Sequence, residues 1–113
     1  MIVTVSRERE ATDDAVRISS STVAATLGSN GATGIVEGPA EWSAWAFATA
    51  VRASLETAAA DGTPEARDVV LLTVRDEEGT AVVSVSAEAP AGELESSVAY
   101  RILRTVRPAP VTS

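Results

Sequence analysis

The chain has 113 residues, a size that fits one domain, with a net charge of −7 and a hydrophobic fraction of 45%. It contains no histidine and no cysteine, and its nine basic residues are all arginine. Disulfides, cysteine metal sites, a Ser-His-Asp triad and lysine-dependent chemistry are therefore excluded. The sequence predicts a protein that is not an enzyme and that carries no cofactor and no metal.

The acidic balance argues against binding to nucleic acid or to an anionic membrane surface, because both attract clustered positive charge. No apolar stretch reaches the roughly 18 residues that cross a bilayer. The first residues, "MIVTVSRERE", do not resemble a secretory signal. We therefore expect a cytoplasmic protein, with a virion component left open. The wealth of Arg, Ala, Val and Thr is typical of a GC-rich genome.

The N-terminal third predicts two short strands, one in "IVTV" and one in "TGIVEG". The sequence pattern of residues 12–28 is compatible with either a helix or a strand. Thr12, followed by two aspartates, is a good helix start, but the hydroxyl run Ser19–Thr22 weakens a helix. We favour a helix near residues 21–28 that is preceded by extended chain.

A glycine-rich stretch, "TLGSNGATGIVEGP", covers residues 26–39. Its spacing is not the G-x-G-x-x-G of dinucleotide-binding loops, and the P-loop lysine is absent. Gly28-Ser29-Asn30-Gly31 resembles the G-x-x-G loop of KH domains, a resemblance that implies RNA binding. The basic residues that would grip a nucleic-acid backbone are missing, so we interpret Gly28 as the C-terminal cap of a helix followed by turns.

A long central helix is predicted over residues 40–60. Gly38, Pro39 and Glu41 are start signals, and Gly62 with Pro64 is a stop signal. At helical spacing this segment has two apolar faces, so the second face would meet another element, a ligand or another copy. One face carries Trp42, Trp45, Ala46 and Ala53, and the other carries Phe47, Val51, Leu55 and Ala58.

A β-hairpin is predicted over residues 68–87, where two β-branched runs flank an acidic turn that ends in Gly79. The run 69–74 is apolar at nearly every position, which is typical of a strand covered on both faces. A final helix is predicted over residues 92–107, with glutamates in its first turn and arginines in its last. The sequence thus predicts a small two-layer α+β domain over residues 1–108, with a frayed tail at 109–113.

The candidate site residues are apolar or basic. Trp42, Trp45, Phe47, Val69 and Leu71 are candidates for an interface or a ligand pocket. Arg101, Arg104 and Arg107 line one side of the last helix and form a possible patch for an anion or an acidic partner. The carboxylate pairs Asp13/Asp14 and Glu77/Glu78 are interpreted as solvated.

Three functions follow as hypotheses. The first is a non-enzymatic interaction or assembly module that acts as a homo-oligomer or as a subunit of a larger complex, such as a viral or secretion-type particle. The second is a binding domain for a small apolar ligand, with Trp42, Trp45 and Phe47 lining the pocket. The third comes from a resemblance: the order of a long helix, a hairpin and a final helix is similar to small adaptor domains of bacterial conflict systems, from which no residue is carried over.

Overall fold

The structure is a computed structural model, and it describes residues 2–7, 12–42, 44–79 and 81–107, with side chains from residue 12 onward. The elements in chain order are β1 (Ile2–Arg7), α1 (Asp13–Ser29), β2 (Thr33–Pro39), β3 (Phe47–Ala58), β4 (Pro64–Arg75), β5 (Ala81–Pro90) and α2 (Val98–Thr105). The predicted tail at 109–113 lies outside the described residues.

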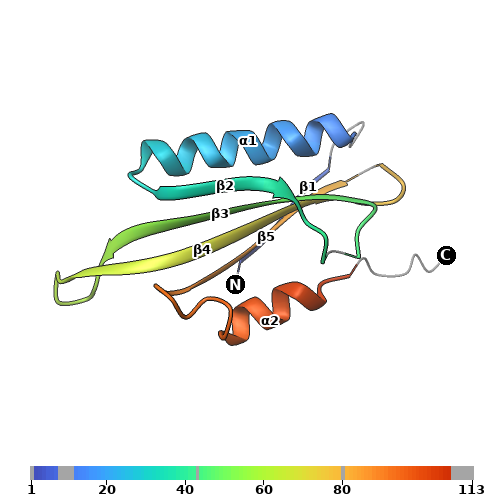
Figure 1. Cartoon of the computed structure of the whole chain (residues 1–113). Helices are drawn as coiled ribbons and strands as arrows, with labels where there is room; N and C mark the ends of the chain where they lie inside the picture. Colours follow the sequence, from blue (N-terminus) through green and yellow to red (C-terminus); the bar gives the residue numbers. More distant parts are fainter. Residues whose placement is uncertain (1, 8–11, 43, 80, 108–113) are drawn as a thin grey trace.

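The five strands form one antiparallel sheet in the order β1-β5-β4-β3-β2. Helix α1 covers one face of this sheet and α2 covers the other (Figure 1). The predicted α+β class is confirmed, as is a C-terminal helix packed on a sheet that contains the hairpin. The layers are helix, sheet and helix, however, and not the two layers that the sequence predicted.

The two faces of the sheet differ in their cores. Under α2, the alternate positions of β4 and β5 are almost all apolar and join Leu94 and Leu103 in one cluster. Under α1, the second cluster in the described residues contains Val16 and Val82, with Ala15 and Phe47 packed beside them, and Val51 and Ala53 are also buried on this face. The larger cluster consists of Val70, Leu72, Val74, Val83, Val85, Ala87, Ala89, Leu94 and Leu103.

The predicted helix at 40–60 is wrong. Residues 47–58 form β3, a strand held between β2 and β4 on both of its edges. Its buried residues alternate with a period of two, since Thr49, Val51 and Ala53 are buried while Arg52 and Ser54 are exposed. The two predicted helix faces are not retained, because Ala53 shares a strand face with Phe47 and Val51 and the tryptophans lie before the strand. Pairing on both edges outweighs the helical preference of the alanines.

Helix α1 resolves the open question at residues 12–28. Thr12 is the N-cap, and its hydroxyl accepts a hydrogen bond from the N–H of Ala15 at 3.1 Å. The favoured extended chain before residue 21 is wrong, because the helix already begins at Asp13. The hydroxyls of Thr22 and Thr26 bond to carbonyls four residues earlier, at 2.8 and 2.9 Å, which lets these residues sit inside a helix.

The predicted hairpin is confirmed, with β4 and β5 longer than residues 68–87 at their outer ends. The last helix is shorter than the predicted 92–107. Ser97 is its N-cap, since the Ser97 hydroxyl accepts from the N–H of Tyr100 at 3.1 Å. Gly92 has a φ of 83° and donates its N–H to Asp68, so the chain turns at 92 and the helix starts only at Val98.

The glycine-rich stretch ends α1. The N–H of Gly31 bonds to the carbonyl of Gly28, and that of Ala32 bonds to the carbonyl of Leu27, which is the Schellman pattern. Gly31 adopts a φ of 88° and follows the C-cap Asn30. The sequence predicts the C-terminal cap at Gly28, and the observed cap, Asn30, lies two residues later. The positive φ at position 31 explains why a glycine is required there.

Replacing Gly31 with alanine is expected to lower the free energy of unfolding by about 1–2 kcal/mol, because a Cβ disfavours positive φ. No atom lies within 4 Å of the added Cβ, so the cost comes from the backbone alone. Gly38→Ala is the matched control, since its Cβ also meets open space and its φ is not positive. Urea unfolding measures both, and equal effects of the two substitutions would contradict this explanation.

Candidate interaction surfaces

The three aromatic candidates do not meet. Trp42 and Trp45 lie in the loop between β2 and β3 and pack against the core under α2. The rings of Trp42 and Tyr100 are 6.1 Å apart between centroids. Phe47 packs on the opposite face of the sheet, beside Val16. The tryptophans and Phe47 are thus separated by the sheet and do not line one pocket.

Val69 and Leu71 lie on the α1 face of β4 and are half-buried. Their neighbours Val70, Leu72 and Val74 point to the α2 face and are fully buried. The strand that the sequence identified as covered on both faces is therefore covered by elements of its own chain. Its apolar character does not by itself call for a partner.

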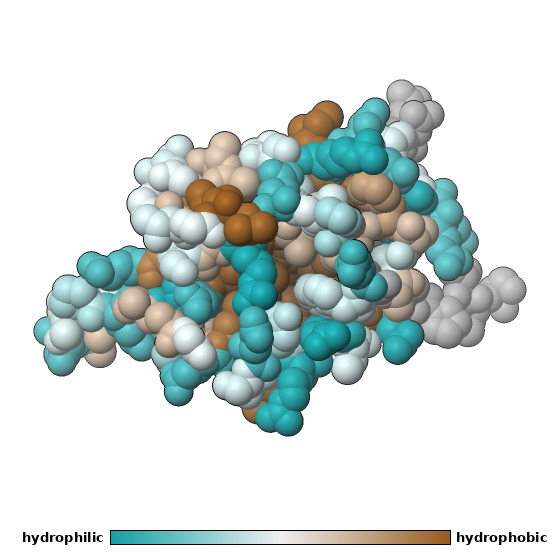
Figure 2. All heavy atoms as spheres, viewed as in Figure 1, coloured by the Kyte–Doolittle hydropathy of each residue, from teal (hydrophilic) through white to brown (hydrophobic). Residues whose placement is uncertain are grey.

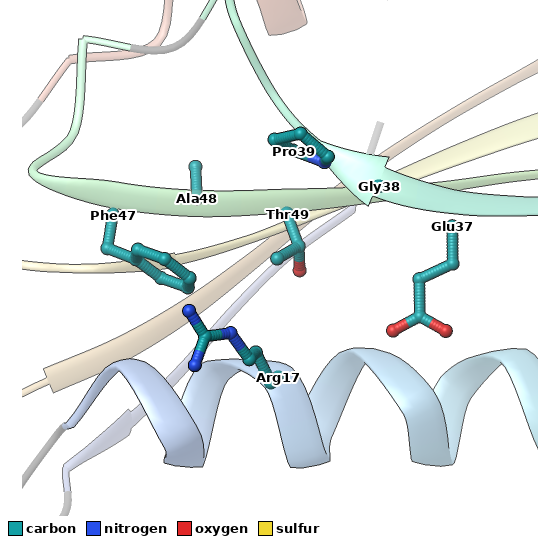
Figure 3. Close-up of a pocket in the computed structure, with 7 residues that line it drawn as sticks. All are labelled: Arg17, Glu37, Gly38, Pro39, Phe47, Ala48 and Thr49. Carbon is teal, nitrogen blue, oxygen red and sulfur yellow. The ribbon is translucent and has the colours of Figure 1, made fainter.

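A hollow of about 430 Å³ lies between α1 and the β2–β3 pair. Figure 3 shows the Arg17 guanidinium beside the Phe47 ring, with Glu37 and Thr49 pointing toward α1. The guanidinium carbon is 5.0 Å from the ring centroid, and Arg17 also pairs with Asp14 at 3.2 Å. Glu37 accepts a hydrogen bond from the Ser21 hydroxyl at 3.0 Å. Both charged groups are thus engaged with neighbours, and they hold α1 against the sheet.

Three hydroxyls are buried between α1 and the sheet, those of Ser20, Thr49 and Thr73. Thr49 and Thr73 are cross-strand neighbours in β3 and β4. None of the three side-chain oxygens makes a hydrogen bond to another described residue. Since a buried hydroxyl without a bond costs free energy, α1 rests on a surface that is less favourable than the core under α2.

Strand β2 is a free edge of the sheet, because among the described strands it pairs with β3 alone. The N–H of Ala40 bonds to the carbonyl of Ala48, and in an antiparallel pair alternate residues face the partner strand. Gly38 and Val36 therefore face β3, while the backbone of Glu37 and of Pro39 faces outward. Pro39 has no N–H to leave unpaired there, which is where proline is tolerated in a sheet.

The chain segment that forms most of this edge is uncharged, since no charged residue occurs from Ile18 to Val36, and the charged neighbour across from Val36 is Arg52 of β3. Ile18 and Val36 are 67% and 64% exposed. In Figure 2 the pale and brown residues gather over the C-terminal half of α1 and the first part of β2, with teal residues around them. We call this area, formed by β2 and residues 18–29 of α1, the edge surface.

The three arginines of the C-terminal segment differ in their ion pairing from the arginines between residues 12 and 79. Between residues 12 and 79 each arginine forms an ion pair, namely Arg17 with Asp14, Arg52 with Glu95, Arg67 with Glu65 and Glu88, and Arg75 with Asp13. Arg101, Arg104 and Arg107 are exposed and form no ion pair with any carboxylate in the described ranges. The sequence-predicted patch is therefore a row of unpaired cations.

The carboxylates show no catalytic or metal-binding arrangement within the described residues, where no group of three or more potential ligands comes together. Two aspartates have a lowered pKa. Hydrogen bonds from the Gly92 N–H and the Ser54 hydroxyl lower the pKa of Asp68, and the Thr63 N–H does the same for Asp61. Asp68 and Asp61 stabilise turns through these hydrogen bonds. The pair Glu77/Glu78 is exposed in the turn between β4 and β5.

Sequence reasoning missed the edge surface. The sequence predicts a strand in "TGIVEG", but the position of this strand at an edge depends on β3, for which the sequence predicts a helix. The absence of charge from Ile18 to Val36 was the available signal.

Comparisons with known proteins add no family. No family model, no curated protein and no solved structure matches the chain. No helix in the described residues is long and apolar enough to span a membrane.

Proposed function

We propose that this protein is a non-enzymatic assembly module that associates with a second copy of itself through the edge surface. The observation that carries the proposal is the edge position of β2, which offers outward backbone groups between an exposed valine on the α2 side of the sheet and an uncharged stretch of α1 on the other side. Open edges with few charges are templates for pairing with another chain.

A second copy fits this surface because of its charge. Each chain carries a net charge of −7, so two copies repel over most of their surfaces. The edge surface is where they can approach with few charges, because the charged residues in and beside it are held by their own chain. Glu37 of β2 is held by Ser21 toward α1, and Arg52, across from Val36, is paired with Glu95.

The size of the surface is adequate. At the usual rise per residue β2 extends for about 23 Å and α1 for about 25 Å. Two β2 strands paired antiparallel about a two-fold axis would bring the two α1 helices side by side. A normal interface of about 1,200 Å² in total needs contributions from both elements.

Val36→Lys is expected to weaken self-association about tenfold or more, because it places a charge on the edge strand. Val98→Lys is the matched control, since Val98 is equally exposed at 65% but lies on α2. Sedimentation at about 0.5 M salt, where contacts between exposed charges are screened, measures both variants. A wild-type protein that stays monomeric to about 1 mM, or equal effects of the two substitutions, would refute the proposal.

A further inference from the structure

The proposed pairing through the edge surface does not involve the three unpaired arginines of the C-terminal segment. From Ser96 to Arg107 the sequence contains Arg101, Arg104 and Arg107 and no acidic residue. Elsewhere the described arginines from Arg17 to Arg75 are ion-paired. The outer side of α2 is therefore a basic surface on an acidic protein.

The complementary surface lies on the same molecule. Glu77 and Glu78 are adjacent and exposed in the turn between β4 and β5, and neither forms an ion pair within the described part of the chain. The nearest arginine in sequence, Arg75, is held by Asp13 at 2.7 Å. Where the strands leave the sheet, Asp76 accepts a hydrogen bond from the N–H of Ala81 at 3.3 Å. The two glutamates are presented to solvent between these residues.

No ion pair joins the two surfaces within the described part of one molecule. Both the β4–β5 turn and the last turn of α2 lie at the same end of the sheet (Figure 1). The Arg75 side chain, just before the turn, points to the α1 face and pairs with Asp13, while α2 is on the opposite face. A two-fold axis at this end would place each α2 against the turn of the other copy, so that the contact forms twice.

We infer that Arg101 and Arg104 on α2 dock on Glu77 and Glu78 of a second copy, forming a reciprocal, charge-based contact that is separate from the edge surface. Electrostatic complementarity of this kind steers association and fixes the register of the two partners. Together with pairing at β2, the contact would link dimers into a larger assembly. It goes beyond the proposed function, because it needs neither β2 nor α1.

Charge reversal tests the contact with the protein itself as the probe. Two double variants are made, Arg101→Glu with Arg104→Glu, and Glu77→Arg with Glu78→Arg. At about 0.02 M salt each variant alone is expected to lose the contact, since like charges then face each other. Mixed in equal amounts they are expected to associate again, because each basic surface then meets an acidic one in both halves of the contact.

Sedimentation and light scattering at about 0.02 M and about 0.5 M salt read the result. The wild-type contact is expected to weaken about tenfold at the higher salt. Glu41→Arg with Glu56→Arg changes the net charge as much as the turn variant does and is the matched control; both residues are exposed. This control should retain the salt-sensitive association.

Two results would overturn the inference: a wild-type association that does not respond to salt, or reversed variants that fail to associate when mixed. If a reversed variant loses its circular dichroism signal, Arg101→Gln with Arg104→Gln and Glu77→Gln with Glu78→Gln replace it. Each neutral variant should then lose the salt-sensitive step, and its retention would refute the contact. Failure of pairing through the edge surface can be distinguished from failure of this contact. The effect of Val36→Lys is measured at high salt, and the effect of the charge variants is measured at low salt.

Discussion

Leu103→Ala is expected to lower the free energy of unfolding by about 3 kcal/mol, within the range of leucine deletions from well-packed cores. Leu103 is the buried residue of α2, at 1% exposure, and it lies in the cluster with Leu72 and Val85. An eight-residue helix has little stability of its own, so its position on the sheet depends on this side chain. Urea unfolding measures the loss.

Val98→Ala is the control for the same helix, because Val98 is exposed. It should change the free energy of unfolding by less than about 0.5 kcal/mol. A loss below about 1 kcal/mol for Leu103→Ala would mean that α2 is not anchored on the sheet as described.

Thr73→Val is expected to raise the free energy of unfolding by about 1–2 kcal/mol. Thr73 is fully buried under α1, and its hydroxyl makes no hydrogen bond to the described residues. Valine has the same shape and removes the desolvated oxygen, so the change gains the free energy that the isolated hydroxyl costs. Thermal and urea unfolding measure the gain.

Thr73→Ser separates the hydroxyl from the methyl group. It keeps the oxygen and removes buried apolar volume, so it should lower the free energy of unfolding by about 1 kcal/mol. If both substitutions are destabilising, the Thr73 hydroxyl has a hydrogen-bond partner in solution, and the polar surface beneath α1 contributes to stability.

The hairpin of β4 and β5 was predictable because its signals are local. Dense β-branched runs on both sides of an acidic turn that ends in Gly79 allow few other structures. The caps at Thr12 and Ser97 are equally local, since each hydroxyl bonds to a residue three positions later. The sequence nevertheless predicts a helix start at 92 in place of Ser97, and it favours extended chain after Thr12 although it identifies Thr12 as a good helix start.

Strand β3 was not predictable in the same way. Its small residues Ala48, Ala50 and Ala53 favour a helix locally, and the strand is formed by pairing with β2 and β4. The error propagated to the site, because a helix at 40–60 would group the tryptophans differently and would leave β2 without its neighbour. The unpaired state of Arg101 also depends on where distant carboxylates lie, which sequence spacing does not reveal.

Amide hydrogen exchange of Glu37 tests the central proposal, that β2 pairs with a second copy, most directly. The Glu37 N–H faces away from β3, so it is open in a monomer and bonded in a β2-paired dimer. Raising the protein concentration from about 10 μM to about 1 mM should slow its exchange about tenfold or more, while amides inside β4 stay unchanged. Association of the protein over this range with no change at Glu37 would contradict pairing through β2.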